Sequence, residues 1–167
     1  MAESTFELID SATLTSSAAS IDFTGISGSF RDLVLQVDHP TNLTNSVVLY
    51  LRFNSDATNS YTSLTLESSG SSTSTQNRYS QTHISPGFTS GYFGESSTFN
   101  YQIMDYATSK EKTVLYRHQV ALYNANYKYT IAGVARWANT SAITSITITG
   151  NRNFDAGLKV NLYGLVG

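Results

Sequence analysis

The fold of this chain is decided by the stretch Asp32-Leu33-Val34-Leu35-Gln36-Val37-Asp38. Its apolar residues include an alternating set, so that Leu33, Leu35 and Val37 would project to one face. Side chains alternate between the two faces of a β-strand, whereas the faces of a helix repeat with a longer period. The stretch therefore predicts a strand with one buried face.

The same alternation continues along most of the chain, and helical periodicity is almost absent. It predicts about nine strands, at residues 6–9, 21–23, 32–38, 47–53, 99–103, 112–123, 128–138, 144–148 and 158–162. Many short strands separated by polar turns indicate an all-β, antiparallel β-sandwich that is jelly-roll-like. We expect a single domain of this kind over residues 1–167. Within it, Trp137 shares a strand face with Ile131, which predicts that the indole packs in the core.

One region lacks the alternating pattern. Residues 68–80 form a low-complexity stretch rich in Ser and Thr, and the glycine-containing segment 86–94 follows. We predict a long loop between two strands. Loops of this length in a compact domain usually carry function or disorder, so it is also a candidate interaction loop. Phe88, Tyr92 and Phe93 lie in this region without strand periodicity. They are the candidate interaction residues, since exposed aromatic rings suit a protein interface or the face of a sugar.

The composition excludes several classes of function. Charged residues make up only 13% of the chain and the net charge is −2, so no general basic field for nucleic acid is present. The chain has no cysteine, which excludes disulfides and thiolate chemistry. No secretory signal is visible at the N-terminus, and the longest apolar run, residues 47–51, is too short to cross a membrane. We expect neither a nucleic-acid nor a membrane partner.

Residues with catalytic chemistry are few and scattered. His39, His83 and His118 share no metal-ligand spacing, and no strand-to-helix nucleophile elbow is present. A Ser-His-Asp site could still assemble in three dimensions, because such triads are not tied to sequence order. The few carboxylates mostly lie in turns or at strand ends. We therefore predict no enzymatic activity, no catalytic residues and no metal or cofactor.

One turn resembles the start of a calcium-binding loop. The segment Asn54-Ser55-Asp56-Ala57-Thr58-Asn59 places side-chain oxygens at alternate positions. Its sixth position is Asn59 rather than Gly, and its twelfth is Thr65 rather than Glu. A hairpin turn stabilised by the Asp or Asn side chain explains the same residues with fewer assumptions.

Several motifs resemble small virion structural proteins of tailed bacteriophages. These motifs are Ser20-Ile21-Asp22-Phe23-Thr24-Gly25-Ile26, Phe30-Arg31-Asp32-Leu33-Val34-Leu35, Leu51-Arg52-Phe53-Asn54-Ser55-Asp56 with Asn59-Ser60-Tyr61, Ala142-Ile143-Thr144-Ser145-Ile146-Thr147-Ile148, and Asn153-Phe154 with Gly157 and Leu162-Tyr163-Gly164-Leu165. The resemblance covers residues 6–165, and its motifs are strand and turn patterns. It brings no catalytic residues, and the Ser/Thr-rich stretch 68–75 departs from many such sequences.

The resemblance implies a jelly-roll-like sandwich on the virion, made in the host cytoplasm. The main prediction is a capsid decoration (cement) protein that binds the lattice of the major capsid protein and stabilises the shell. The alternative is a tail or fibre component that binds a receptor or a host-surface glycan, and a small hydrolase with a hidden Ser-His-Asp site is the third. We also predict a homo-oligomer, with a trimer favoured, because equivalent linked contacts raise the effective affinity.

Overall fold

A computed structural model describes residues 5–39, 47–68, 72–86, 97–120 and 129–167 of the chain. Within these ranges the chain forms eleven strands and no helix. The strands are β1 (Phe6–Thr13), β2 (Ala18–Thr24), β3 (Asp32–His39), β4 (Leu49–Phe53), β5 (Tyr61–Ser68), β6 (Thr73–Gln81), β7 (Ser97–Met104), β8 (Lys112–Val120), β9 (Tyr129–Trp137), β10 (Ser145–Phe154) and β11 (Lys159–Leu165).

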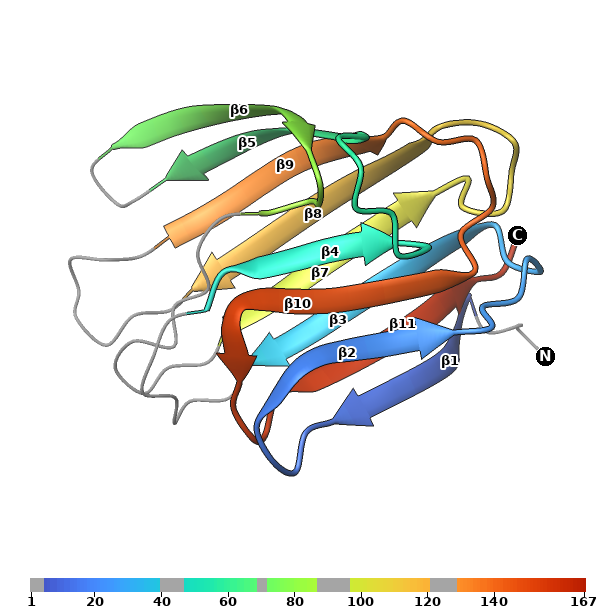
Figure 1. Cartoon of the computed structure of the whole chain (residues 1–167), viewed down its shortest axis with the longest axis horizontal. Coiled ribbons are helices and arrows are strands. Elements are labelled where there is room, and N and C mark those ends of the chain that lie inside the picture. Colours follow the sequence, from blue (N-terminus) through green and yellow to red (C-terminus); the bar gives the residue numbers. More distant parts are fainter. Residues whose placement is uncertain (1–4, 40–46, 69–71, 87–96, 121–128) are drawn as a thin grey trace.

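The strands form two sheets that lie face to face, with the smaller sheet in front in Figure 1. The larger sheet has eight strands in the order β1-β11-β3-β7-β8-β9-β5-β6, and the smaller has three in the order β2-β10-β4. Neighbouring strands within each sheet run antiparallel. The predicted all-β antiparallel sandwich is therefore confirmed, with eleven strands in place of about nine.

The core fills the space between the two sheets. Leu33, Leu35 and Val37 of β3 are buried, as the alternation predicts. Trp137 is fully buried, with its ring 5.5 Å from that of Phe53 between centroids, so the prediction of core packing is also confirmed. Each such side chain contributes about 1.5–3 kcal/mol to folding through removal of apolar surface from water.

The prediction of a long loop over residues 68–80 is wrong, because most of this segment forms β6. This strand lies at the edge of the larger sheet and pairs with β5 from Ser68 opposite Thr73 to Tyr61 opposite Gln81. Its side chains are exposed or half-buried, so neither face carries an apolar alternation. Backbone hydrogen bonds to β5 hold such an edge strand, and Thr favours extended structure.

The neighbouring strand β5 places polar residues at core positions and leucines on the surface. Tyr61, Ser63 and Thr65 face the core, whereas Leu64 and Leu66 are each 49% exposed on the opposite face. The buried hydroxyl of Thr65 lies 2.6 Å from the Tyr116 hydroxyl on β8, which satisfies both groups. Hydrogen bonding thus allows polar residues to occupy core positions, and the leucines are left on the surface.

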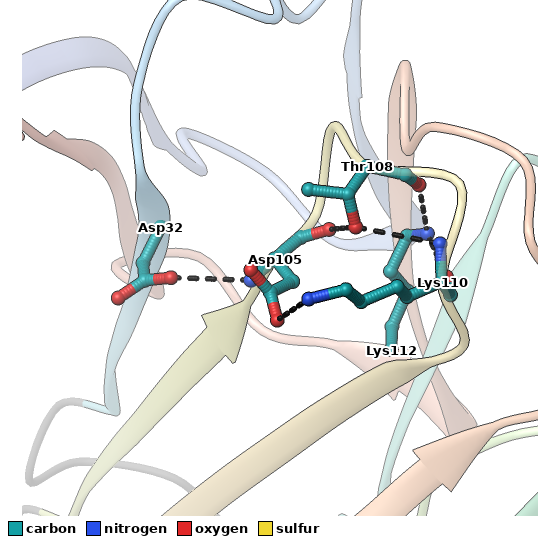
Figure 2. Close-up of polar contacts among 5 residues, drawn as sticks. All are labelled: Asp32, Asp105, Thr108, Lys110 and Lys112. Carbon is teal, nitrogen blue, oxygen red and sulfur yellow. Dashed lines mark hydrogen bonds and ion pairs between the residues drawn. The ribbon is translucent and has the colours of Figure 1, made fainter.

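Charged side chains hold the turn between β7 and β8, as Figure 2 shows. The carboxylate of Asp32 accepts a hydrogen bond from the backbone N–H of Asp105 at 3.1 Å, where the backbone has a positive φ of 53°. The ammonium of Lys112 is fully buried and donates to the carbonyl oxygens of Thr108 and Lys110. Burial lowers the pKa of Lys112. The turn carbonyls therefore replace the water that this cation has lost.

Candidate binding face

The predicted interaction residues Phe88, Tyr92 and Phe93 lie outside the residues that the structure describes. Among the described residues, the candidate binding surface is instead the outer face. It is defined as the side of the eight-stranded sheet that is turned away from the smaller sheet. Of the eight large hydrophobic side chains exposed in the described part of the chain, seven are on strands of this sheet and on its outer face: Phe6, Leu8, Leu64, Leu66, Tyr79, Leu115 and Val134.

Strand register aligns several of these residues into one row across the sheet. Leu64 of β5 lies opposite Val134 of β9, which lies opposite Leu115 of β8. The row, called the apolar row below, continues through Gln102, Val34, Tyr163 and Leu8 to the far edge. Directly opposed side chains in adjacent strands are about 4.5–5.5 Å apart at Cβ. The row therefore forms one continuous strip of mainly apolar surface.

A polar row runs beside the apolar row, displaced by two residues along each strand. Its central members, Arg117 of β8 and Asn100 of β7, lie opposite each other and are both exposed. Neither side chain hydrogen-bonds or ion-pairs with any other described residue. Gln102 makes only a long contact, 3.4 Å from its Nε2 to the Asp32 carboxylate. Donors and acceptors at the centre of the face are therefore available to a ligand.

The outer face is hollowed where the two rows meet. A central hollow of about 440 Å³ is lined by side chains that include Phe6, Asn100, Gln102, Leu115 and Arg117. Two neighbouring hollows of about 380 and 370 Å³ extend it along the sheet. The first is lined in part by Leu64, Asn77, Tyr79, Val134 and Arg136, and the second by Thr98, Asn100, Arg117, Gln119 and Thr130.

The chemistry of the central hollow suits a ligand with both hydroxyl and apolar C–H surface. A guanidinium and two amides offer several donors and acceptors, and the guanidinium fork also matches a carboxylate. The ring of Phe6, which is 52% exposed, offers a flat apolar surface beside them. No carboxylate lines the hollows given above.

Two of the three histidines lie close together at one buried end of the sandwich. Register places His39 opposite Ser97, and His118 stacks on Phe99, two residues further along β7, with ring centroids 3.6 Å apart. Burial lowers the pKa of His39 to about 4, opposed by the charge of Asp155, and burial with the proximity of His39 lowers the pKa of His118 to about 3. The chain thus holds both imidazoles neutral at ordinary pH.

These groups do not form a Ser-His-Asp site. Among the described residues, the Ser97 hydroxyl and both ring nitrogens of His39 and of His118 are buried without a hydrogen-bond partner. A serine nucleophile needs a hydrogen bond to its base, and the base needs one to the residue that orients it. His83 lies elsewhere, with its ring 4.0 Å from that of Tyr50. In the part of the chain that the structure describes, no three His, Asp or Glu residues are grouped to hold a metal.

The turn that resembles a calcium loop is occupied by protein donors. The Asp56 carboxylate accepts hydrogen bonds from the Thr58 backbone and hydroxyl, the Ser60 hydroxyl and, at 2.7 Å, the Trp137 indole N–H. Burial raises the pKa of Asp56, but the hydrogen bonds from Thr58, Trp137 and Ser60 outweigh it and hold the pKa well below its usual range. This geometry is the side-chain turn that the sequence favoured over calcium.

Comparison with known proteins identifies no family for this chain. No family model matches the sequence, and no curated protein matches it. Among solved structures, the galectin LEC-6 of Caenorhabditis elegans aligns over 94% of this chain and 96% of its own, at 12% identity and a TM-score of 0.36. Peanut lectin aligns over 98% and 85% at 5% identity and 0.28, and the SPRY domain of human HERC1 over 88% and 98% at 10% identity and 0.26. The fold assignment rests on the strand pairing of the chain itself.

Within the described ranges, no helix has the length and apolar character needed to cross a bilayer.

The outer face was not predicted from the sequence, because the predicted contact residues are those outside the alternating pattern. A signal was present, since Leu64 and Leu66 alternate with the polar residues Ser63 and Thr65. Leu115 and Val134 likewise stand between core positions of their strands. Two-sided apolar strands indicate a sheet with a second contact surface, but only the strand order aligns these residues.

Proposed function

We propose that this protein is a non-enzymatic, glycan-binding module that uses the outer face of its eight-stranded sheet. The observation that carries the proposal is the central hollow, where Arg117 and Asn100 are exposed beside the ring of Phe6 and have no side-chain partner among the described residues. Sugars present hydroxyl groups at their edges and C–H groups on their ring faces, so they need this combination of groups. The buried side chains of Ser97, His39 and His118, which have no hydrogen-bond partner in the part of the chain that the structure describes, support a module without catalysis.

The resemblance of residues 6–165 to phage virion proteins supports a setting for this module. We place it on the virion, as a tail or fibre component that recognises a host-surface glycan. Such a component gains from several linked copies, because each shallow site binds weakly and multivalency raises the overall affinity by about 10²–10⁴-fold. A homo-oligomer, with a trimer favoured, is part of the proposal.

The apolar row favours a second candidate, the capsid decoration protein. Leu64, Val134 and Leu115 form a continuous exposed strip over three strands, and apolar strips of this kind mark protein interfaces. In this candidate the outer face docks on the major capsid protein lattice. The two candidates differ in which row carries the contact energy.

A substitution pair separates the two candidates. Arg117→Ala should weaken glycan binding by at least about tenfold, since one hydrogen bond to a charged group is worth about 1.5–3 kcal/mol. Asn100→Ala should weaken it less, since a neutral hydrogen bond is worth about 0.5–1.5 kcal/mol. Leu115→Ser with Val134→Ser should instead abolish binding to undecorated capsids if the second candidate holds. Glycan arrays followed by calorimetry, and capsid sedimentation, measure the two effects. Arg152→Ala, an exposed arginine on the other sheet, is the matched control.

The outcomes are distinct. Glycan binding that is unchanged in both Arg117→Ala and Asn100→Ala would remove the outer face as the glycan site. Absence of binding to any glycan, together with capsid binding that depends on the apolar row, would replace the first candidate by the second.

A further inference from the structure

A second polar cluster lies away from the outer face, where the edges of the two sheets approach each other. After β6 the chain leaves the edge of the larger sheet and descends to β4 at the edge of the smaller one (Figure 1). There Ile84 pairs with Leu51 through two backbone hydrogen bonds of 2.9 Å. This crossing brings side chains from β4, from β6 and from residues 82–83 into one region.

Three of these side chains are basic. Arg52 of β4 donates from Nε to the carbonyl oxygen of Thr82 at 3.0 Å, which fixes its guanidinium beside the crossing segment. The ring of His83 packs on Tyr50, with 4.0 Å between centroids, and its Nδ1 is 3.1 Å from the Thr82 hydroxyl. Arg78 of β6 lies opposite Ser63, on the inward-facing side of the sheet and not on its outer face, and its charge acts on His83.

The positive charge of this cluster is not compensated by a direct partner. Arg52, Arg78 and His83 are all half-buried, and burial together with the charges of Arg52 and Arg78 lowers the pKa of His83. No carboxylate forms an ion pair with either guanidinium among the described residues. Glu67 reaches Arg78 only indirectly, through Gln76, whose amide donates to Glu67 at 3.3 Å and whose oxygen accepts from Arg78 at 2.7 Å.

One donor in the cluster is both buried and unused. Nε of Arg78 is inaccessible to solvent and has no hydrogen-bond partner within the described ranges. Such an atom costs about 1–3 kcal/mol when it stays unsatisfied, and buried charges in proteins are normally paired. The net charge of the protein is −2, so an excess of basic residues does not explain two neighbouring guanidinium groups beside an imidazole. A ligand that carries negative oxygens would compensate their charge.

We propose that Arg52, Arg78 and His83 form a binding site for an oxyanion group, of the sulfate or phosphate type. Guanidinium groups bind such oxygens with two parallel hydrogen bonds, and an imidazolium adds a third charged donor. The group could arrive as a free ion or as the anionic substituent of a polysaccharide, and both sources present the same oxygens. The site is separate from the hollow proposed to bind glycan, so it stands if that proposal fails.

The imidazole of His83 reports directly on occupancy of this site. Sulfate should raise the pKa of His83, followed by NMR of the ring, by about 1, since a neighbouring opposite charge favours the protonated form. Sodium chloride at the same ionic strength should leave it unchanged. Inorganic phosphate tests the same chemistry, and a sulfated disaccharide beside its unsulfated form distinguishes a polysaccharide substituent from a free ion: tighter binding of the sulfated sugar than of sulfate assigns the polysaccharide.

Variants decide whether the named residues form the site. Arg78→Met and Arg52→Met keep most of the side-chain stem but remove the charge, and each should abolish the sulfate response of His83. Arg152→Met, at an exposed arginine of β10 outside both proposed sites, is the matched control and should retain it. Arg78→Met should fold, because it removes an unsatisfied donor, and its melting temperature in chloride verifies this. A sulfate response equal to that in chloride, or one that persists in both Arg78→Met and Arg52→Met, would overturn the proposal.

Discussion

The hydrogen bond between Thr65 and Tyr116 offers a sharp test of how polar residues are accommodated in this core. The two hydroxyl groups lie 2.6 Å apart, and both residues are buried. Tyr116→Phe leaves the Thr65 hydroxyl buried without its partner, which should cost about 1–3 kcal/mol of unfolding free energy. Thr65→Val should cost less, because the Tyr116 hydroxyl keeps a second acceptor, the carbonyl oxygen of Leu64 at 3.4 Å.

The double variant distinguishes an unsatisfied partner from simple loss of contacts. When both hydroxyls are replaced by apolar groups of the same shape, no buried polar group is left behind, and the cost should fall well below the sum of the single costs. Urea unfolding followed by the fluorescence of Trp137, the single tryptophan, gives the three free energies. Thr113→Val on the exposed side of β8 is the control and should change little. Additivity within about 0.5 kcal/mol would refute the reasoning.

Three further predictions concern acid stability, a glycine and the buried lysine. The unfolding free energy should fall as the pH decreases from 6.5 toward about 4. The reason is that His39 and His118 take up protons near pH 6.5 in the unfolded chain, whereas burial lowers their pKa to about 4 and about 3 in the folded chain. Urea titrations across this range should show a flatter profile when both histidines are replaced by Phe. Gly133→Ala should destabilise the protein by about 1–3 kcal/mol, because a Cβ would overlap the buried Tyr116 ring, whereas melting unchanged from the wild type would contradict this. Lys112→Met should lower the melting temperature in calorimetry, because two turn carbonyls lose their donor; an equal or higher melting temperature would show that the buried cation is dispensable.

The sequence predicted the core well because the core residues follow a strict alternation. Leu33, Leu35 and Val37, for example, are buried on one face as expected. Strand β6 was not predicted, since an edge strand with two polar faces has no hydrophobic periodicity and is held by backbone pairing. The proximity of His39 to His118 was equally inaccessible, because it depends on the order β3-β7-β8 within the sheet. Long-range strand order is not encoded in local pattern.

The candidate binding site was predictable only in part. An exposed aromatic contact surface was expected, but its predicted residues Phe88, Tyr92 and Phe93 lie outside the described ranges. The outer face depends on residues from seven strands that only the register aligns, from Leu8 on β1 to Leu64 on β5. The basic cluster depends on the crossing at Ile84, which has no sequence signature.

The alternation along β8 and β9 has a consequence for how this protein can diversify. Leu115 and Arg117 on the outer face stand between Val114, Tyr116 and His118, which are buried. Exposed substitutions usually change stability by less than about 0.5 kcal/mol, whereas substitutions of the buried neighbours cost several times more. Every second position of these strands is therefore open to change while the fold is retained. Successive single substitutions can therefore change the chemistry of the outer face while every variant along the series still folds.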